Sequence, residues 1–145
     1  MNTWFKRGLP QGESAAEPAK KFYAVKDDDT FHYDIKIAAD AVLLATAKEQ
    51  AKSYKKGRNL VGTITSSNSW NRRQDVILFL NREYGSLCEE METHSVAQIC
   101  QRYGVPFIGL RVLSNAELHG EMFDPAAGRA SQKFALQVAK AYYLR

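Results

Sequence analysis

From residue 59 to the C-terminus, runs rich in β-branched and apolar residues alternate with segments of helical periodicity. The expected strands are 60–65, 87–90 and 107–113, and the expected helices are 73–84, 93–103 and 130–144. Gly85 and Gly104 follow the first two helices, where glycine commonly ends a helix. Strands and helices joined in turn by short links predict an α/β fold, with a largely parallel sheet covered by helices. The crossovers are expected to be right-handed.

The earlier part of the chain is less regular. Phe22 to Val25 and the alternating residues 31–37 are predicted as strands, and Asp40 is predicted to cap a helix over residues 40–56 that stops at Gly57. A length of 145 residues favours a single domain, 1–145. Within it we expect an irregular N-terminal segment, 1–34, and a regular region, 35–145.

Composition excludes several classes of protein. Hydrophobic residues make up 45% of the chain and charged residues 25%, which is typical of a globular protein and not of a disordered one. The apolar runs are too short to cross a bilayer, and the first twelve residues show no secretory signal, so no membrane partner is expected. Cys88 and Cys100 are typical of reduced thiols. These features predict a cytoplasmic protein.

The net charge of +4 is small, and only two compact basic runs occur, at residues 55–58 and 72–73. A solvated helix end explains the first run better than a nucleic-acid site does, so no nucleic-acid partner is expected. His32, His94, His119 and the two cysteines lack the spacing of metal ligands. No glycine-rich phosphate loop or nucleophile elbow is present in the sequence. We therefore expect neither a metal nor a cofactor.

Polar side chains follow all three of the expected later strands. The clusters are Ser66 to Trp70, then Glu89, Glu90 and Glu92, then Ser114 and Asn115 with Glu117 and His119 beyond them. In open parallel sheets, ligands bind outside the carboxyl ends of the strands. If the strands are neighbours, the three clusters converge on one crevice.

The glutamates and the tryptophan each allow two interpretations. Carboxylates suit a vicinal diol, because each oxygen can accept a hydrogen bond from one sugar hydroxyl. The alternative is a solvated turn with a glutamate at a helix N-terminus, where the helix dipole favours an anion. Trp70 offers a flat face to a ring, or it covers the end of the sheet.

Four segments carry a resemblance to a known family: residues 61–64, 66–70, 90–93 and 105–115. In their order and spacing they resemble the purine nucleoside and uridine phosphorylase superfamily, and within it the methylthioadenosine/S-adenosylhomocysteine nucleosidase-like proteins. The Glu-Met-Glu-Thr element and the Val-Pro-Phe run ending in Ser-Asn are the most specific pieces. The resemblance covers residues 35–145 and implies a three-layer α/β/α fold.

The resemblance also implies roles for matching residues. Glu92 would bind the ribose hydroxyls and stabilise a ribosyl cation, Met91 would pack on the sugar, and Glu90 would lie beside them. Trp70 would stack on the base. Ser114 and Asn115 occupy the place of a Ser-Asp pair whose acid protonates the purine. Glu92 and Asn115 are thus the expected catalytic residues, and the expected substrate-binding residues are Trp70, Glu90, Met91, Glu92, Ser114 and Asn115.

This sequence departs from the family pattern in two ways. Asn115 can donate a hydrogen bond but cannot transfer a proton, which predicts slow cleavage of 6-aminopurine nucleosides or a preference for 6-oxopurines. Glu117 or His119 is a substitute acid by hypothesis. The N-terminal half of the family fold has no counterpart in residues 1–34, so we expect the chain to lack it. An exposed sheet edge would follow, and with it self-association or pairing with a separate N-terminal chain.

The function predicted from these residues is cleavage of the N-glycosidic bond of a purine nucleoside. The partners expected are a nucleoside or purine base, and phosphate if the reaction is phosphorolysis. Two alternatives stay open: a purine nucleoside phosphorylase, and a truncated nucleoside-binding protein without turnover. A basic nucleic-acid adaptor is a third hypothesis that rests on charge alone.

Overall fold

The computed structural model describes residues 36–68 and 70–145. These residues form two compact units, and each is presented by itself. Of the described residues, the first unit contains 36–37 and 62–99, and the second contains 38–61 and 100–145. The predicted strand at 22–25 and most of the one at 31–37 lie outside the described residues, while Lys36 and Ile37 are not in a strand.

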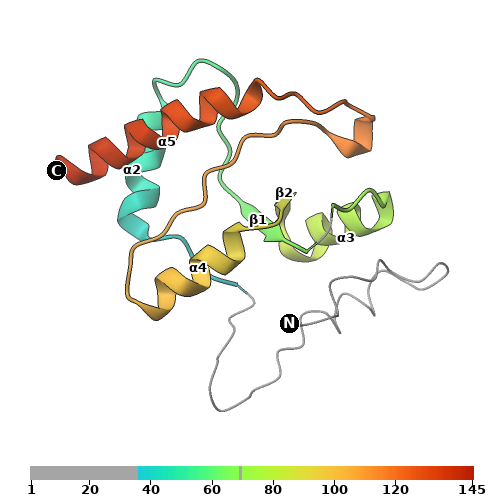
Figure 1. The fold of residues 1–145 in the computed structure, drawn as a ribbon, viewed down its shortest axis with the longest axis horizontal. Helices are drawn as coiled ribbons and strands as arrows, with labels where there is room; N and C mark the ends of the chain where they lie inside the picture. Colours follow the sequence, from blue (N-terminus) through green and yellow to red (C-terminus); the bar gives the residue numbers. More distant parts are fainter. Residues whose placement is uncertain (1–35, 69) are drawn as a thin grey trace, which may run out of the picture. The chain divides into compact units, whose positions relative to one another are not determined.

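The first unit is built on two parallel strands. Strand β1 (Thr63–Ser66) pairs with β2 (Ser86–Glu90), and the pairs include Thr65 with Glu89 and Ser66 with Glu90. Helix α3 (Gln74–Tyr84) connects them and lies against β2 (Figure 1). The parallel register aligns the carboxyl ends of the two strands, so the polar residues that end them become neighbours.

Helix α3 supplies the core of the first unit. Phe79 and Leu80 are buried, and Val76 and Tyr84 pack against them. The Phe79 and Tyr84 rings meet edge to face, with 6.0 Å between centroids. The helix ends at Gly85, whose φ of 64° lies in the left-handed region that glycine adopts without a side-chain penalty.

Helix α4 (Thr93–Arg102) follows β2 after a turn of two residues. It ends before Gly104, which has a φ of 65°. The boundaries predicted for this helix, for α3 and for β2 are confirmed to within a residue or so. Gly85 and Gly104 follow the two helices with positive φ, which explains why the sequence located the ends of these helices well.

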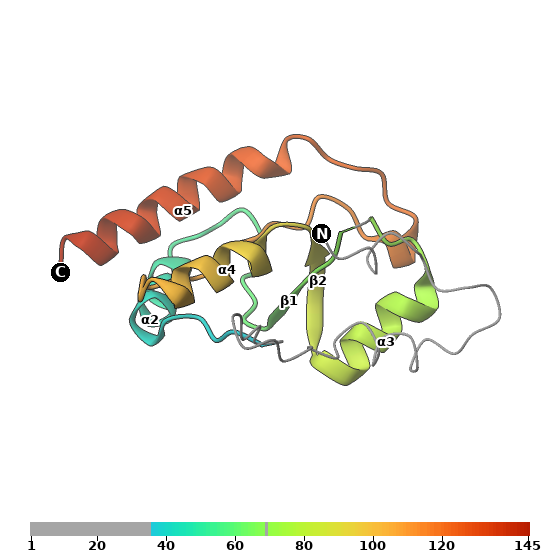
Figure 2. The same cartoon turned by 60° about the horizontal axis from the view of Figure 1, so that its bottom comes forward.

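The second unit pairs α2 (Ala41–Ala51) with α5 (Ala127–Tyr143), as Figure 2 shows. Leu43, Ala47 and Val138 are its buried apolar residues. The Tyr54 and Phe134 rings meet edge to face at 5.3 Å. This unit also holds the short 3₁₀ helix η2 (Glu117–His119).

Asp40 caps α2 as predicted. Its Oδ1 accepts hydrogen bonds from the backbone N–H groups of Val42 and Leu43, at 3.0 and 2.9 Å. The predicted end at residue 56 is wrong, because α2 stops at Ala51. Three successive N–H groups, of Lys52, Ser53 and Tyr54, bond to carbonyls three residues back, and this tighter pattern closes the helix.

Two further boundaries differ from prediction. Strand β1 covers 63–66 and not 60–65, since Leu60 and Val61 are exposed and belong to the second unit. Helix α5 begins at residue 127 and not at 130. Asp124 starts that turn early, because its side chain accepts from the Ala126 N–H at 2.8 Å.

The predicted third strand, Phe107 to Leu113, is wrong: the structure assigns no strand there. The Phe107 carbonyl accepts from the Asp40 N–H at 2.8 Å, which ties this segment to the start of α2. Pro106 has no N–H to give to a strand ladder. An apolar run becomes a strand only with a partner, and its own sequence does not supply one. The described sheet has two strands.

Helices and a parallel sheet agree with an α/β fold. The three-layer arrangement, the single domain and its division at residue 34 stay predictions. None of the helices within the described ranges combines the length and the apolar character that a membrane span requires.

Candidate functional site

The polar residues that end β1 and β2 form a hydrogen-bonded cluster in the first unit. Ser66 Oγ donates to Glu90 Oε1, and Ser67 Oγ donates to Glu89 Oε1 at 2.8 Å. The Ser67 N–H donates to the Glu90 carbonyl, also at 2.8 Å. The predicted convergence of strand ends is therefore confirmed for the first two clusters.

The Glu90 carboxylate also caps helix α4. Its Oε2 accepts from the backbone N–H groups of Glu92 and Thr93, at 3.0 and 2.8 Å. The next N–H, that of His94, donates to Ser66 Oγ at 2.9 Å. The first N–H groups of a helix have no partner within the helix, and here Glu90 and Ser66 supply one for each of the three. Of the two interpretations of the glutamates, Glu90 fits the one in which a carboxylate binds the N-terminus of a helix.

These contacts change the acidity of both carboxyl groups. Partial burial raises the pKa of Glu90, but hydrogen bonds from Ser66, from Thr93 and from the backbone N–H of Glu92 outweigh burial and lower the pKa to about 2. Glu89 behaves oppositely: burial raises the pKa of its carboxyl, and hydrogen bonds from Ser67 and Asn71 only partly offset that rise. Glu90 is therefore held as a carboxylate, whereas Glu89 is biased toward protonation.

His94 lies beside this cluster at the start of α4. Burial lowers the pKa of its imidazole, and the Glu90 charge acts in the opposite direction. The imidazole is therefore biased toward its neutral form.

Met91 and Glu92 form the turn between β2 and α4, and both side chains are exposed. The Glu92 carbonyl accepts from the Val96 N–H at 3.2 Å, which makes Glu92 the first residue engaged by the helix. Glu90 thus holds the turn from within, and Glu92 is open to solvent one residue before the helix.

Trp70 also belongs to the first unit, and 54% of its surface is exposed. The Arg72 guanidinium lies over its ring at 5.6 Å from the centroid. An exposed indole of this kind offers apolar area to a planar ligand.

Ser114 and Asn115 belong to the second unit, so the convergence of the third cluster with the other two stays a prediction. Ser114 Oγ donates to Asn115 Oδ1 at 3.0 Å, and Asn115 Nδ2 donates to Glu117 Oε1 at 3.3 Å. The Ser114 carbonyl accepts from the Asp124 N–H at 2.8 Å. Both bonds made by the amide are local to the loop and to η2, and they fix which way the amide faces. His119 is exposed at the end of η2.

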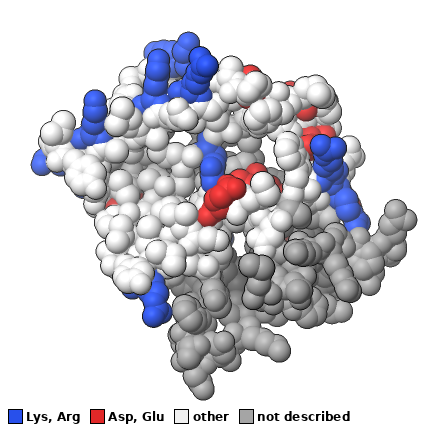
Figure 3. Space-filling view, viewed as in Figure 1, with Lys and Arg blue, Asp and Glu red and all other residues white. Residues whose placement is uncertain are grey.

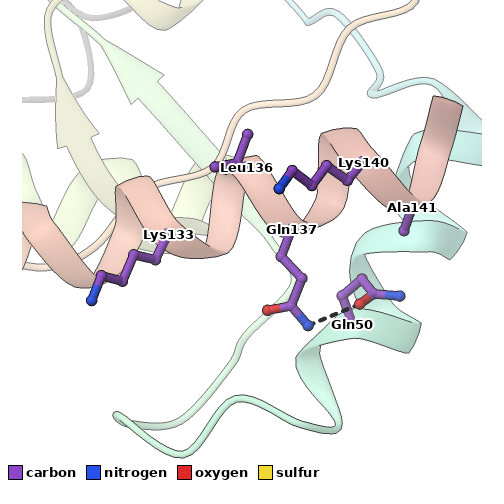
Figure 4. A pocket seen from close by; sticks show the side chains of 6 residues that line it. All are labelled: Gln50, Lys133, Leu136, Gln137, Lys140 and Ala141. Carbon is purple, nitrogen blue, oxygen red and sulfur yellow. Dashed lines mark hydrogen bonds between the residues drawn. The ribbon is translucent and has the colours of Figure 1, made fainter. Parts of the chain in front are cut away.

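A cavity lies in the second unit. It has a volume of about 470 Å³ and is open to solvent along α2 and α5. Its lining residues are Gln50, Lys133, Leu136, Gln137, Lys140 and Ala141 (Figure 4). None of the predicted site residues lines it, so it lends no support to the candidate site.

No group of histidine, cysteine and acidic residues in the described ranges could hold a metal ion. Neither Cys88 nor Cys100 is in a disulfide.

Sequence reasoning missed one part of the cluster, the pairing of individual serines with individual glutamates. The polar ends of the strands signalled it, but only the register assigns Ser66 to Glu90.

The chain matches the family described as the Phosphorylase superfamily over residues 12–142. It belongs to that family, and the resemblance noted in its sequence is confirmed.

Several relatives are named 5'-methylthioadenosine/S-adenosylhomocysteine nucleosidase. The one from Geobacillus sp. (strain WCH70) is 28% identical over 69% of this chain and 46% of its own length. The one from Haemophilus influenzae (strain PittEE) is 28% identical over 90% of this chain and 52% of its own length. The one from Halalkalibacterium halodurans is 37% identical over 52% of this chain and 33% of its own length. The chain thus spans about half the length of the curated relatives it matches, and no solved structure matches it significantly.

Proposed function

We propose that this chain acts in cleaving the N-glycosidic bond of a purine nucleoside, the activity that the names of its relatives indicate. One observation carries the proposal: the Glu90 carboxylate fixes a turn at the carboxyl ends of two parallel strands, and this turn exposes Met91 and Glu92. Ligands of open parallel sheets bind at such an edge.

The ribose is assigned to Glu92 and Met91, with Glu90 beside them. Loss of the base leaves positive charge on the sugar, in an oxocarbenium-like state. A carboxylate near the developing charge stabilises it, and Glu92 can also accept hydrogen bonds from the two ribose hydroxyls. Met91 is 47% exposed and offers apolar contact to the sugar.

The base is assigned to Trp70, Ser114 and Asn115. The exposed indole would stack on the purine. One N–H of the Asn115 amide goes to Glu117, and an amide has two, so a second can reach an acceptor on the base. An amide does not transfer a proton, which favours bases that leave readily without one. We therefore propose a preference for 6-oxopurine nucleosides over 6-aminopurine nucleosides.

The same amide favours a second candidate function, nucleoside binding without turnover. Proton transfer to the leaving base contributes about 10²–10⁴-fold in rate, and Asn115 cannot supply it. The acceptor of the ribosyl group, water or phosphate, separates a nucleosidase from a phosphorylase. The following experiment distinguishes a nucleosidase, a phosphorylase and a protein that binds nucleosides without turnover.

Release of purine base is measured for the purified chain with methylthioadenosine, S-adenosylhomocysteine, adenosine and inosine, with and without phosphate. We expect release to be faster from inosine than from adenosine. Replacing Glu92→Gln keeps the shape of the side chain and removes its charge, and is expected to slow release about 10²–10³-fold.

Binding of the same nucleosides is measured alongside by calorimetry. Release that is unaffected by Glu92→Gln contradicts the assigned role of Glu92. Absence of release, with binding that Glu92→Gln weakens, establishes the binding function in place of the enzyme. Absence of both overturns the proposal.

A further inference from the structure

The Ser66 hydroxyl on β1 forms hydrogen bonds with two other elements, β2 and α4. Its Oγ donates to the Glu90 carboxylate at the end of β2, and the same oxygen accepts from the His94 N–H in the first turn of α4. These partners are 24 and 28 residues away along the chain. One hydroxyl on β1 thus contacts both the end of β2 and the start of α4, the two elements that flank the candidate ribose turn.

The turn between these two contacts is the one that carries Met91 and Glu92. Glu90 fixes its beginning through the N–H groups of Glu92 and Thr93, and Ser66 fixes both Glu90 and the residue after Thr93. The exposed Glu92 side chain itself is not needed for any of these bonds. The backbone on both sides of Glu92 is therefore held, and its side chain is exposed at the surface of the turn.

We propose that Ser66 is a positioning residue, whose hydroxyl sets the place of the Glu92 carboxylate through Glu90 and the start of α4. This inference rests on the proposed function, because it names a residue that serves the same site. A displacement of about 1 Å in a catalytic group can cost on the order of 10²-fold in rate. The role proposed for Ser66 is to act on rate through this placement, by its contacts with Glu90 and His94.

Hydrogen-bond donors and one titratable side chain surround the Glu90 carboxylate. Ser66 approaches it from β1, the N–H groups of Glu92 and Thr93 from the turn, and His94 from α4. Removing the Ser66 hydroxyl deletes one of the hydrogen bonds that hold the carboxylate ionised. The pKa of Glu90 then rises from about 2 toward its ordinary value of 4.5.

The test compares Ser66→Ala with Ser66→Thr, which restores a hydroxyl at the same position. We expect Ser66→Ala to lower kcat about 10-fold or more while KM changes little, and Ser66→Thr to recover most of the rate. The matched control is Thr65→Val. Thr65 Oγ1 lies 2.8 Å from Ser86 Oγ and also links β1 to β2, but the hydroxyl does not contact Glu90. We expect Thr65→Val to leave kcat and the pKa of Glu90 unchanged.

A second measurement needs no catalysis. The Glu90 side chain is titrated by nuclear magnetic resonance, and amide hydrogen exchange is followed at Thr93 and His94. Ser66→Ala is expected to raise the pKa of Glu90 and to speed exchange of the His94 amide, with Ser66→Thr close to the parent protein.

The outcomes separate the two proposals. If the parent protein neither releases base nor binds nucleosides, the proposed function fails, and the titration and exchange still show whether Ser66 holds the turn. If the parent is active and Ser66→Ala alters the Glu90 pKa without lowering kcat, Ser66 supports the structure only and the positioning role is overturned. Equal losses of kcat in Ser66→Ala and Thr65→Val also overturn it, because weaker strand pairing then explains both.

Discussion

The two groups of candidate site residues are held in different ways. In the first unit, Ser66, Ser67, Glu89 and Glu90 are joined by bonds that span 22 to 28 residues of sequence. In the second unit, the side-chain hydrogen bonds of Ser114 with Asn115 and of Asn115 with Glu117 span one and two residues. The first group depends on strand pairing, whereas the second is organised by its own loop. Substitutions in the loop should therefore change chemistry with little effect on the fold, and substitutions near the strands should change both.

The largest effect is expected for Asn115→Asp in the loop. An aspartate can carry a proton to the purine, so cleavage of adenosine and methylthioadenosine should rise about 10²–10⁴-fold relative to the parent chain. Base release from adenosine and from inosine is measured in parallel. Because the Asn115 amide bonds only within its loop and η2 in the contacts described above, the unfolding temperature should change little.

The isosteric Asn115→Leu is the control that removes hydrogen bonding altogether. It should weaken nucleoside binding without any gain on adenosine. A gain of the same size in Asn115→Leu and Asn115→Asp would show that proton transfer is not the cause.

An intermediate effect is expected from the two cores. Phe79 is 4% exposed in the first unit and Val138 is 2% exposed in the second. Phe79→Ala should lower the free energy of unfolding by about 3–5 kcal/mol, and Val138→Ala by about 1.5–3 kcal/mol. Amide hydrogen exchange in α3 and α5 shows which unit each variant loosens. If the units are independent, Phe79→Ala speeds exchange mainly in α3 and Val138→Ala mainly in α5.

Matched controls lie on the same two helices. Leu78 is 56% exposed and Leu136 is 57% exposed, so truncating either to alanine should change stability by less than about 0.5 kcal/mol. Equal acceleration of exchange in α3 and α5 by Phe79→Ala would mean that the two units unfold together.

The smallest effect is expected in the pH dependence of stability. The pKa of Glu90 is lower in the folded chain than its ordinary 4.5, so its carboxylate stabilises the fold above that value. This contribution is lost as the pH falls from 4.5 toward about 2. The pKa of Glu89 is raised, so its contribution has the opposite sign and is lost as the pH rises above 4.5.

Unfolding by urea between pH 2 and pH 7 separates the two carboxyl groups. Glu90→Gln should be less stable than the parent at pH 6, and the difference should shrink toward pH 2. Glu89→Gln should be closest to the parent at low pH and gain on it as the pH rises. A constant difference across the range for Glu90→Gln would show that Glu90 is not held as a carboxylate by the fold.

The sequence predicted well what short-range chemistry decides. Asp40 at the start of α2 and Gly85 at the end of α3 were identified because a cap or a left-handed glycine acts on its own turn. The prediction of a strand at 107–113 is wrong for the opposite reason, since a strand requires a partner that its own residues do not reveal. The sequence indicated polar strand ends, but the contact of Ser66 with Glu90 followed only from the parallel register.

Charge is also distributed differently in the two units. Lysine and arginine side chains gather on the face formed by α5 (Figure 3), where Arg129, Lys133 and Lys140 are exposed. In the first unit, Arg73 immediately before α3 instead pairs with Asp75 in its first turn, with Nη2 2.6 Å from Oδ2. Helix α5 contains three basic residues and no acidic one, which explains why this face is basic although the net charge of the chain is only +4.

The hydrogen bonds of Ser66 with Glu90 and His94 affect the order in which the chain acquires structure. The partners of Ser66 become available only after α3 and both strands have been synthesised, since Glu90 and His94 lie 24 and 28 residues downstream. Closing a loop of that length carries an entropic cost that strand pairing must offset before the hydroxyl meets its carboxylate. The turn formed by Glu90, Met91 and Glu92 therefore becomes ordered only after the two strands have paired. A folding intermediate without β1–β2 pairing would have no organised ribose turn.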